Sequence, residues 1–250
     1  MRKVLFIVIM VLICCSTQGF AATLISDNFD SYTAGSPPGD DWNTDNSGAI
    51  IVIDNETYNS SHNAVYVRRS STGGSFSHNH TPITDQVTYE AFLRSSTNQR
   101  ETLVMYAGGS GGSGPWISFG GIAGYLAYYD GSWHNITTVN ANQWYHVKIV
   151  ASVSSHTFDI YVDDMNTPLI TGANFRDGSS VTTLDYLSFN VYNAFNPPLT
   201  TDSAFVDDVL VSAPISVSVP TMSEWGMIIF MVLSGLSAMY YIRKQRRVES

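Results

Sequence analysis

The sequence predicts an all-β protein, a two-sheet antiparallel sandwich with one helix at each end of the chain. Three observations favour this class. Short apolar or alternating runs recur about every 8–15 residues, with turn residues between them. No helical period is sustained outside the two ends. The only two cysteines, Cys14 and Cys15, lie close to the N-terminus, so a central domain would depend on sheet packing and not on disulfides.

The N-terminus is typical of a secretory signal peptide. Arg2 and Lys3 precede the apolar run 4–15, and small residues follow as far as Ala21. We expect residues 1–21 to be removed on export, together with both cysteines. A lipoprotein signal acylated at Cys15 is an alternative, but such a signal requires a small residue immediately before that cysteine.

The C-terminal residues 221–250 predict a membrane segment. Residues 225–242 form an uncharged run that is long enough to cross about 30 Å of hydrocarbon as a helix. The basic stretch 243–247 follows at once, and basic residues next to a span stay on the cytoplasmic side. The sequence therefore predicts that the chain before this transmembrane helix lies outside the cytoplasm.

The residues around the start of this segment resemble the IPTL-type sorting signals, which are relatives of the PEP-CTERM tails of Gram-negative bacteria. The resemblance rests on eight consecutive residues: Val219, Pro220, Thr221, Met222, Ser223, Glu224, Trp225 and Gly226. Val219 stands where the family has Ile, and Met222 where it has Leu. The resemblance implies a precursor anchored in the inner membrane. An exosortase-like membrane protease then cuts it, and the exported part reaches the cell surface or the extracellular matrix.

The exported part is strongly acidic. It consists of a predicted domain at 22–212 and a short uncharged linker at 213–220. Six Lys and Arg residues face 19 Asp and Glu residues in this part, a net charge of about −13. Such a surface repels nucleic acid and anionic membranes, so the charge favours neutral sugars or divalent cations as partners. Acidity also keeps an extracellular protein soluble, which is the alternative explanation.

Thirteen strands are predicted in the exported domain. Their ranges are 22–25, 49–54, 64–69, 74–78, 86–94, 101–106, 116–120, 125–129, 132–137, 144–152, 157–162, 184–191 and 204–212. Alternate residues of 144–152 share one face, and the set that begins with Tyr145 is predicted to face the core. Asp130-Gly131 lies between two aromatic strand ends and predicts a hairpin with a type I′ turn. The Gly- and Ser-rich stretch 107–115 is predicted to be a mobile loop.

The segment 142–164 resembles the signature hairpin of laminin-G-like and concanavalin A-like domains. Its first strand begins Trp-Tyr-His-Val at 144–147, and its second ends Tyr-Val-Asp-Asp at 161–164. Asp164 stands where those families usually have Gly. The opening stretch 27–32 and the closing stretch 205–211 fit the same families, in which the first and last strands are neighbours. The resemblance implies a jelly-roll sandwich of lectin-like or glucanase-like type.

We find no catalytic signature in the exported domain. Laminarinase-type glycoside hydrolases on this fold carry Glu-x-Asp-x-x-Glu on one strand, which sets two carboxylates about 5 Å apart. No such triplet exists here. The Gly-rich stretch 108–114 matches the residue patterns of the hydrolase nucleophile elbow and of the dinucleotide-binding motif. Both motifs require a helix after them, and none is predicted here, so we interpret the matches as coincidence. The sequence predicts a non-catalytic carbohydrate-binding or matrix-associated module. A polysaccharide-degrading hydrolase or lyase and a purely structural matrix protein are the alternatives.

Aromatic residues concentrate between 116 and 145 and form the first candidate site. Tyr129 and Trp133 flank the predicted hairpin tip, where burial is difficult. Exposed rings beside hydrogen-bonding side chains are typical of proteins that stack sugar rings. Asp130, His134 and Asn135 supply such side chains here. The sequence therefore predicts that this tip binds an extracellular polysaccharide. Packing of these rings into the core is the alternative.

Four aspartates form the second candidate site. Asp27 and Asp30 belong to the opening stretch, and Asp207 and Asp208 to the predicted last strand. If these strands are neighbours, the four carboxylates could supply oxygen ligands for a structural Ca²⁺. The alternative is that they form turn hydrogen bonds and place charge on a sheet edge.

Overall fold

The structure is a computed structural model, and its two compact units are described separately. It describes residues 21–39, 41–45, 50–54, 57–58, 63–68, 74–99, 102–191, 203–214 and 222–246. One unit is Phe20–Pro214, and the other combines Met1–Gly19 with Ile215–Ser250. Residues 1–20 of the predicted signal peptide and residues 219–221 of the predicted sorting motif lie outside the described residues.

The described residues of Phe20–Pro214 form fifteen strands and one short 3-10 helix. In chain order the strands are β1 (Ala21–Asp27), β2 (Trp42–Asp45), β3 (Ile50–Ile53), β4 (Ala64–Arg68), β5 (Gly74–Ile83), β6 (Gln86–Ser95), β7 (Leu103–Gly109), β8 (Gly112–Phe119), β9 (Tyr125–Tyr129), β10 (Trp133–Thr138), β11 (Trp144–Ser152), β12 (Thr157–Val162), β13 (Ile170–Asn174), β14 (Leu184–Val191) and β15 (Ser203–Pro214). The 3-10 helix η2 (Gly178–Ser180) lies between β13 and β14. The strands β2 and β13 have no predicted counterpart.

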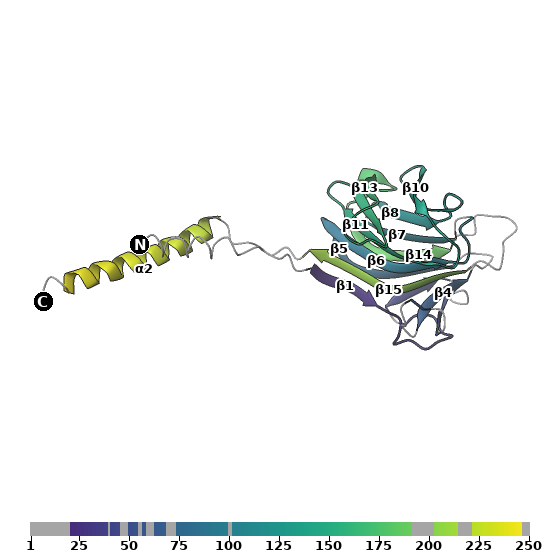
Figure 1. Cartoon of the computed structure of the whole chain (residues 1–250), viewed down its shortest axis with the longest axis horizontal. Helices are drawn as coiled ribbons and strands as arrows, with labels where there is room; N and C mark the ends of the chain where they lie inside the picture. The colour runs from purple at the N-terminus through teal and green to yellow at the C-terminus, as the bar shows by residue number, and fades with distance from the viewer. Residues whose placement is uncertain are drawn as a thin grey trace. The chain divides into compact units, whose positions relative to one another are not determined.

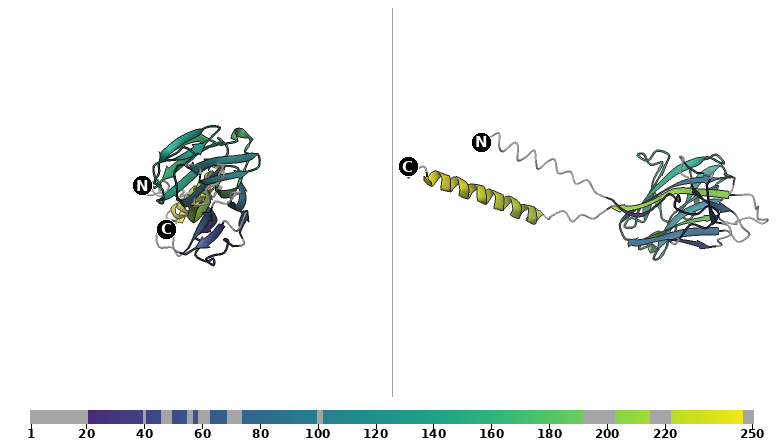
Figure 2. Two further views of the ribbon diagram at one scale, coloured as in Figure 1. Left: turned by 90° about the vertical axis from the view of Figure 1, so that its right-hand side faces the viewer. Right: turned by 90° about the horizontal axis from the view of Figure 1, so that it is seen from below.

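The strands form two antiparallel sheets, as predicted (Figure 1, Figure 2). Sheet A has the order β13-β12-β11-β6-β15-β4-β3, with β1 paired to β15. Sheet B has the order β10-β9-β8-β7-β14-β5-β2. The β1–β15 pairing runs from Ala21 opposite Pro214 to Asp27 opposite Val209. The first and last strands are therefore neighbours, as the resemblance implied.

The hydrophobic core lies between the sheets, because alternate residues of each strand point inward. On β11, the side chains at 145, 147, 149 and 151 are at most 5% exposed, whereas the alternate set is only partly buried. This confirms the predicted orientation of that strand. Fully buried aromatic rings such as Phe76, Phe119, Phe158 and Phe189 fill the space between the layers.

The Gly- and Ser-rich stretch 107–115 is not a mobile loop, which corrects the sequence prediction. It forms the ends and the turn of the β7–β8 hairpin. The segment after β13 packs directly on this hairpin. The Ser113 N–H donates to Asp177 Oδ2 at 2.7 Å, and a Cβ added at Gly111 would collide with the backbone oxygen of Ser180. Glycine is needed here because a second backbone segment lies against the turn.

The β9–β10 hairpin is present, but its turn is not of type I′. Tyr129 pairs with Trp133, so three residues form the loop. Only Gly131 among them has a positive φ, at +113°. A type I′ turn has two loop residues, and both need positive φ. The third loop residue, Ser132, therefore changes the turn type without removing the hairpin.

The second unit contains the helix α2 (Met222–Arg246), which covers the predicted membrane segment 225–242. In the part of the chain that the structure describes, no helix combines the length and the apolarity needed to cross a membrane. The predicted span is therefore not confirmed and stays a prediction.

Candidate functional site

The outer face of sheet B carries aromatic side chains on neighbouring strands. Met105 of β7 and Ile117 of β8 belong to the core, so the residues before Ile117 and after Met105 point outward. These are Trp116 and Tyr106. The two pair directly across the strands, and their ring centroids are 4.6 Å apart.

This arrangement continues across the next two strands. Ile117 pairs with Tyr128 of β9, so the following residue, Tyr129, lies one step along the same ladder, opposite Trp116. Tyr129 in turn pairs with Trp133 of β10, with the ring centroids 5.2 Å apart in an edge-to-face arrangement. We call Tyr106, Trp116, Tyr129 and Trp133 the aromatic row. At about 4.8 Å between strands, the row extends roughly 14 Å.

Arg176, which follows β13, lies over the centre of the aromatic row. Its guanidinium carbon is 4.0 Å from the ring centroid of Trp116 and 5.7 Å from that of Tyr129. A guanidinium over an aromatic face is attracted by the negative ring surface. Trp116 is only 5% exposed. Positive charge is thus placed on this face, although residues 22–220 as a whole are strongly acidic.

Tyr186 of β14 extends the aromatic surface beyond Tyr106. The two rings meet edge to face, with centroids 5.9 Å apart. Tyr186 lies over Gly108, and a Cβ on that glycine would collide with the tyrosine hydroxyl. Burial and the neighbouring Tyr106 hydroxyl raise the pKa of Tyr186 to about 12. The phenol is therefore neutral at physiological pH and can donate a hydrogen bond.

The structure divides the residues predicted to bind sugar between two faces of the β9–β10 hairpin. Tyr129 and Trp133 belong to the aromatic row and are half-buried. Their burial is greater than predicted, because Trp133 packs directly on Gly121. His134 faces the other way and stacks on Tyr128 at 4.8 Å between centroids.

The remaining predicted residues also differ in their surroundings. His134 Nε2 lies 2.9 Å from Asp130 Oδ1, so these two side chains pair with each other within the hairpin. Asn135 is exposed and lies two residues after Trp133 on β10, on the same face as the aromatic row. The sequence prediction included three residues of this face. It missed Tyr106, Trp116, Arg176 and Tyr186.

The first aspartate predicted to bind calcium is already surrounded by protein donors. Asp27 accepts hydrogen bonds from the backbone N–H of Phe29 at 2.8 Å and from the Tyr32 hydroxyl at 2.8 Å. It also accepts one from Trp42 Nε1 at 2.7 Å. Both carboxylate oxygens of Asp27 are therefore used to hold the segment that follows β1.

The carboxylates of Asp207 and Asp30 also accept hydrogen bonds from backbone N–H groups. Asp207 is fully buried, and its oxygens accept the backbone N–H groups of Tyr58 at 2.9 Å and Asp208 at 2.8 Å. Asp30 accepts the N–H of Asn63 at 2.9 Å. Within the described ranges, no group of three or more His, Cys, Asp or Glu is arranged to hold a metal ion. The calcium site therefore stays a prediction. The hydrogen bonds of these aspartates match the alternative role in turns.

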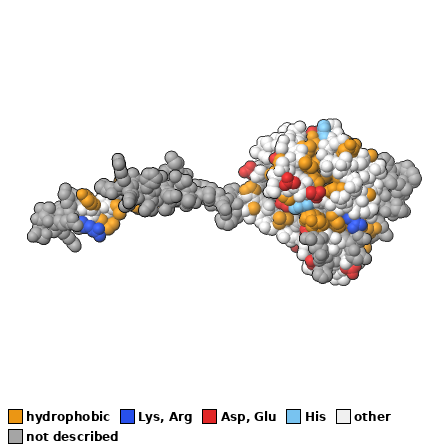
Figure 3. Space-filling model, in the orientation of Figure 1, with side chains coloured by type: hydrophobic (Ala, Val, Ile, Leu, Met, Phe, Trp, Pro, Cys, Tyr) orange, Lys and Arg blue, Asp and Glu red, His pale blue; other side chains and the backbone are white. Residues whose placement is uncertain are grey.

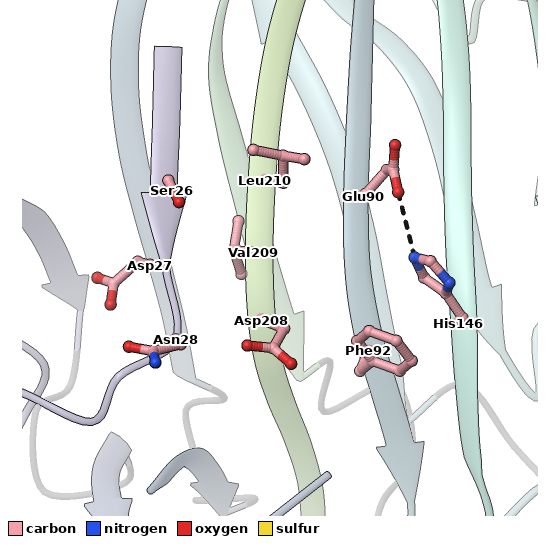
Figure 4. Close-up of a pocket in the computed structure, with 9 residues that line it drawn as sticks. All are labelled: Ser26, Asp27, Asn28, Glu90, Phe92, His146, Asp208, Val209 and Leu210. Carbon is pink, nitrogen blue, oxygen red and sulfur yellow. Dashed lines mark hydrogen bonds and ion pairs between the residues drawn. The ribbon is translucent and has the colours of Figure 1, made fainter. Parts of the chain in front are cut away.

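Asp208 instead lines a pocket of about 280 Å³ on the outer face of sheet A (Figure 4). The end of β1 contributes Asp27 and Asn28, and β15 contributes Asp208. On the opposite side, His146 of β11 lies with its Nε2 3.2 Å from Glu90 Oε2 of β6. The His146 ring stacks on Phe92, with centroids 4.2 Å apart. We call this the sheet A pocket. Nothing in the sequence pattern predicted it.

Carboxylates also gather on the surface of the domain. In the view of Figure 3, Asp and Glu side chains lie beside a histidine and next to hydrophobic side chains near the middle of the domain. Such a mixture of carboxylate, imidazole and apolar surface suits a ligand with polar and apolar parts.

Comparison with known proteins identifies the fold. Neither a protein-family model nor a curated protein matches the sequence. Solved structures do match. A sialidase is 13% identical with a TM-score of 0.59 over 78% of this chain, which spans only 19% of the sialidase. A β-1,3-glucanase from Mycobacterium marinum is 16% identical, with a TM-score of 0.53 over 76% of this chain and 98% of that one.

An alginate lyase is 11% identical, with a TM-score of 0.50 over 78% of this chain and 98% of the lyase. The fold is a concanavalin A-like jelly roll. This confirms the predicted two-sheet sandwich, whereas the signal helix and the membrane span stay predictions. At these identities the likeness concerns the fold alone and assigns no activity.

On this jelly roll, the strand at the centre of the aromatic row carries no acid. β8 reads Gly-Ser-Gly-Pro-Trp-Ile-Ser-Phe, and its outward side chains include Trp116 and Ser118. The row therefore offers ring surfaces, hydroxyl groups and one guanidinium.

Asp208 has an unusual backbone and an altered acidity. Its φ is +47°, and it lies where the pairing of β15 with β6 is irregular between Asp207 and Leu210. Such bulges re-aim a side chain. Burial, and then the charge of Asp30, raise the pKa of Asp208, while His146 acts in the opposite direction.

The raised pKa gives a prediction for stability. Between the ordinary value of 3.8 and the raised value, the folded state binds more protons than the unfolded state, so stability falls as pH rises through this window. The ionised Asp208 therefore costs stability at pH 7. We expect Asp208→Asn to raise the melting temperature at pH 7 by on the order of 1 °C and to have no such effect at pH 3. Asn tolerates the positive φ.

Asp164→Asn is the matched control, because its expected change in melting temperature at pH 7 has the opposite sign. The backbone N–H of Asn166 donates to Asp164 and holds the pKa of that carboxyl below its ordinary value. The ionised Asp164 carboxylate therefore stabilises the fold at pH 7, and this stabilisation is lost as pH falls. We expect Asp164→Asn to lower the melting temperature at pH 7. If Asp208→Asn raised the melting temperature equally at pH 7 and pH 3, the ionised Asp208 carboxylate would not be the cause of the instability.

Proposed function

We propose that this protein is a non-catalytic carbohydrate-binding module, and that it holds an extracellular polysaccharide on the outer face of sheet B. The aromatic row carries this proposal. The partly exposed rings of Tyr106, Tyr129 and Trp133 lie on β7, β9 and β10, on either side of β8, whose Trp116 is only 5% exposed beneath Arg176. The jelly-roll neighbours named as a sialidase, a glucanase and an alginate lyase support a carbohydrate ligand.

The rings suit sugars for a physical reason. A sugar ring presents C–H groups on its faces and hydroxyl groups at its edge, so it can stack on an aromatic side chain and hydrogen-bond beside it. Each stacked ring contributes on the order of 1–2 kcal/mol. Half-buried rings such as Tyr129 are already held in place, which reduces the entropy that binding costs. Because the row is longer than one sugar ring, we expect an oligosaccharide to bind more tightly than a monosaccharide.

Replacing Trp133 tests the proposal. We expect Trp133→Ala to weaken polysaccharide binding about tenfold, measured by calorimetric titration of the full-length chain against a panel of neutral and anionic polysaccharides. Trp144→Ala is the matched control, because Trp144 lies on the outer face of sheet A. Since Trp133 packs on Gly121, Tyr129→Ala provides a second variant at the same surface. Equal affinities for wild type and both row variants would rule the row out as the binding surface.

The same polysaccharides separate the alternatives. Release of reducing ends or of unsaturated products would show a hydrolase or a lyase, for which the neighbouring folds give a precedent. Absence of binding across the panel would favour a structural matrix protein.

We further propose that the C-terminal tail determines location and that an exosortase-like protease removes it. Among the described residues, the hydrophobic core cluster extends from Ile25 to Val211, and the tail follows it in the sequence. Deleting 221–250 should therefore release a folded protein into the medium, with an unchanged unfolding transition of the sandwich. Retention of the deleted protein in the membrane fraction would contradict this proposal.

A further inference from the structure

We propose that the sheet A pocket is a second sugar site, one that binds the protonated primary amine of an amino sugar. The two sites are separate, because the pocket lies on the outer face of sheet A and the aromatic row on that of sheet B. The inference shares with the proposed function only the expectation that the ligand is a saccharide.

The pocket has the charge that an ammonium group requires. Two elements contribute carboxylates to it: β6 contributes Glu90 and β15 contributes Asp208. Asp27 also lines the pocket, but its carboxylate points away from these two in Figure 4. The lining contains neither Lys nor Arg. Figure 4 shows the Asp208 and Glu90 side chains on the neighbouring strands β15 and β6, with His146 beside Glu90. An anionic ligand would meet like charge there, whereas a cation would be attracted.

Asp208 is the carboxylate that most needs a ligand donor. Asp27 already accepts three protein hydrogen bonds, and Glu90 has His146. Among the described residues, no donor contacts the Asp208 carboxylate, although burial is the largest cause of its raised pKa. A partly buried acceptor without a donor costs free energy. A ligand ammonium group would supply both the proton donor and the opposite charge.

The rest of the lining distinguishes an amino sugar from a metal ion. The described residues contain no trio of His, Cys, Asp or Glu arranged for a metal, so the negative charge is spread around the cavity. Ser26 and Asn28 offer hydrogen bonds to hydroxyl groups, and Phe92 and Leu210 offer apolar surface. A volume of about 280 Å³ is at the small end of ligand sites and suits one sugar ring.

The test compares two probes that differ only at the amine. Glucosamine carries an ammonium group, and N-acetylglucosamine carries a neutral amide on the same ring. Binding to the full-length chain is followed by the NMR signal of the His146 imidazole, which the His146→Gln variant identifies. We expect glucosamine to shift this signal with a dissociation constant in the millimolar range, and N-acetylglucosamine to bind at least about tenfold more weakly.

Substitutions in the sheet A pocket test which carboxylates contact the ammonium group of glucosamine. Asp208→Asn and Glu90→Gln should each weaken glucosamine binding about tenfold. A melting temperature of Asp208→Asn at or above that of wild type would rule out unfolding as the cause. Trp133→Ala on sheet B should leave glucosamine binding unchanged. Equal binding of both probes, or full affinity in Asp208→Asn, would overturn the inference. Equal polysaccharide affinities for wild type and the aromatic-row variants would refute the proposed function alone, because the glucosamine titration does not depend on that row.

Discussion

Gly111→Ala is expected to destabilise the jelly roll by more than about 4 kcal/mol, measured by urea unfolding of the full-length chain. Gly111 has φ +93°, a region that L side chains rarely adopt. An added Cβ would also collide with the backbone oxygen of Ser180. Backbone cannot move aside as the end of a flexible side chain can, so the β7–β8 turn and the segment after β13 would have to separate.

Gly131→Ala is the matched control for this prediction. Gly131 also has a positive φ, +113°, but a Cβ there would meet no atom within 4 Å. Its cost should therefore be the backbone strain alone, about 1–3 kcal/mol. Equal losses for Gly111→Ala and Gly131→Ala would mean that the segment carrying Ser180 does not pack on the β7–β8 turn.

Asp27→Ala is expected to cost about 3 kcal/mol or more, because it leaves several donors without their acceptor. Trp42 Nε1 and the Phe29 N–H belong to buried residues, and the Tyr32 hydroxyl loses the same partner. Thermal unfolding monitored by near-ultraviolet circular dichroism would report the loss, since Trp42 packs against other aromatic rings of the core.

The neighbouring Ser26→Ala serves as the control, because Ser26 is exposed on the same strand. It should change stability by less than about 0.5 kcal/mol. Asp27→Asn keeps one acceptor oxygen and should fall between the two. If excess calcium raised the melting temperature of wild type but not of Asp27→Ala, the carboxylate would hold an ion, and its hydrogen bonds would be secondary.

Most of the fold could be predicted from the sequence, because long strands with one buried face show alternation. The two missed strands lie at the ends of the sheets, β2 in sheet B and β13 in sheet A. An edge strand needs a less apolar pattern than a central one. β2 has Trp42 as its single large apolar residue, and β13 has Ile170. Local pattern therefore did not distinguish them from loops.

The candidate site was only partly predictable for a different reason. Tyr129 and Trp133 could be predicted because they flank one hairpin, which is a local feature. Their neighbours Trp116 and Arg176 depend on strand register and on a loop that returns from far along the chain. The same holds for Asp207, whose partner Tyr58 is 149 positions away. Spacing in the sequence suggested calcium ligands, but only the folded chain shows which donors take these oxygens.

A crystal structure of the protein with a bound oligosaccharide would test the central claim most directly. The ligand should first be selected from the polysaccharide panel by its affinity. The aromatic row predicts sugar rings stacked within about 4 Å of Tyr129 and Trp133, with ligand hydroxyl or acidic groups near Arg176. An oligosaccharide bound elsewhere on the domain, with the outer face of sheet B unoccupied, would contradict the proposed function.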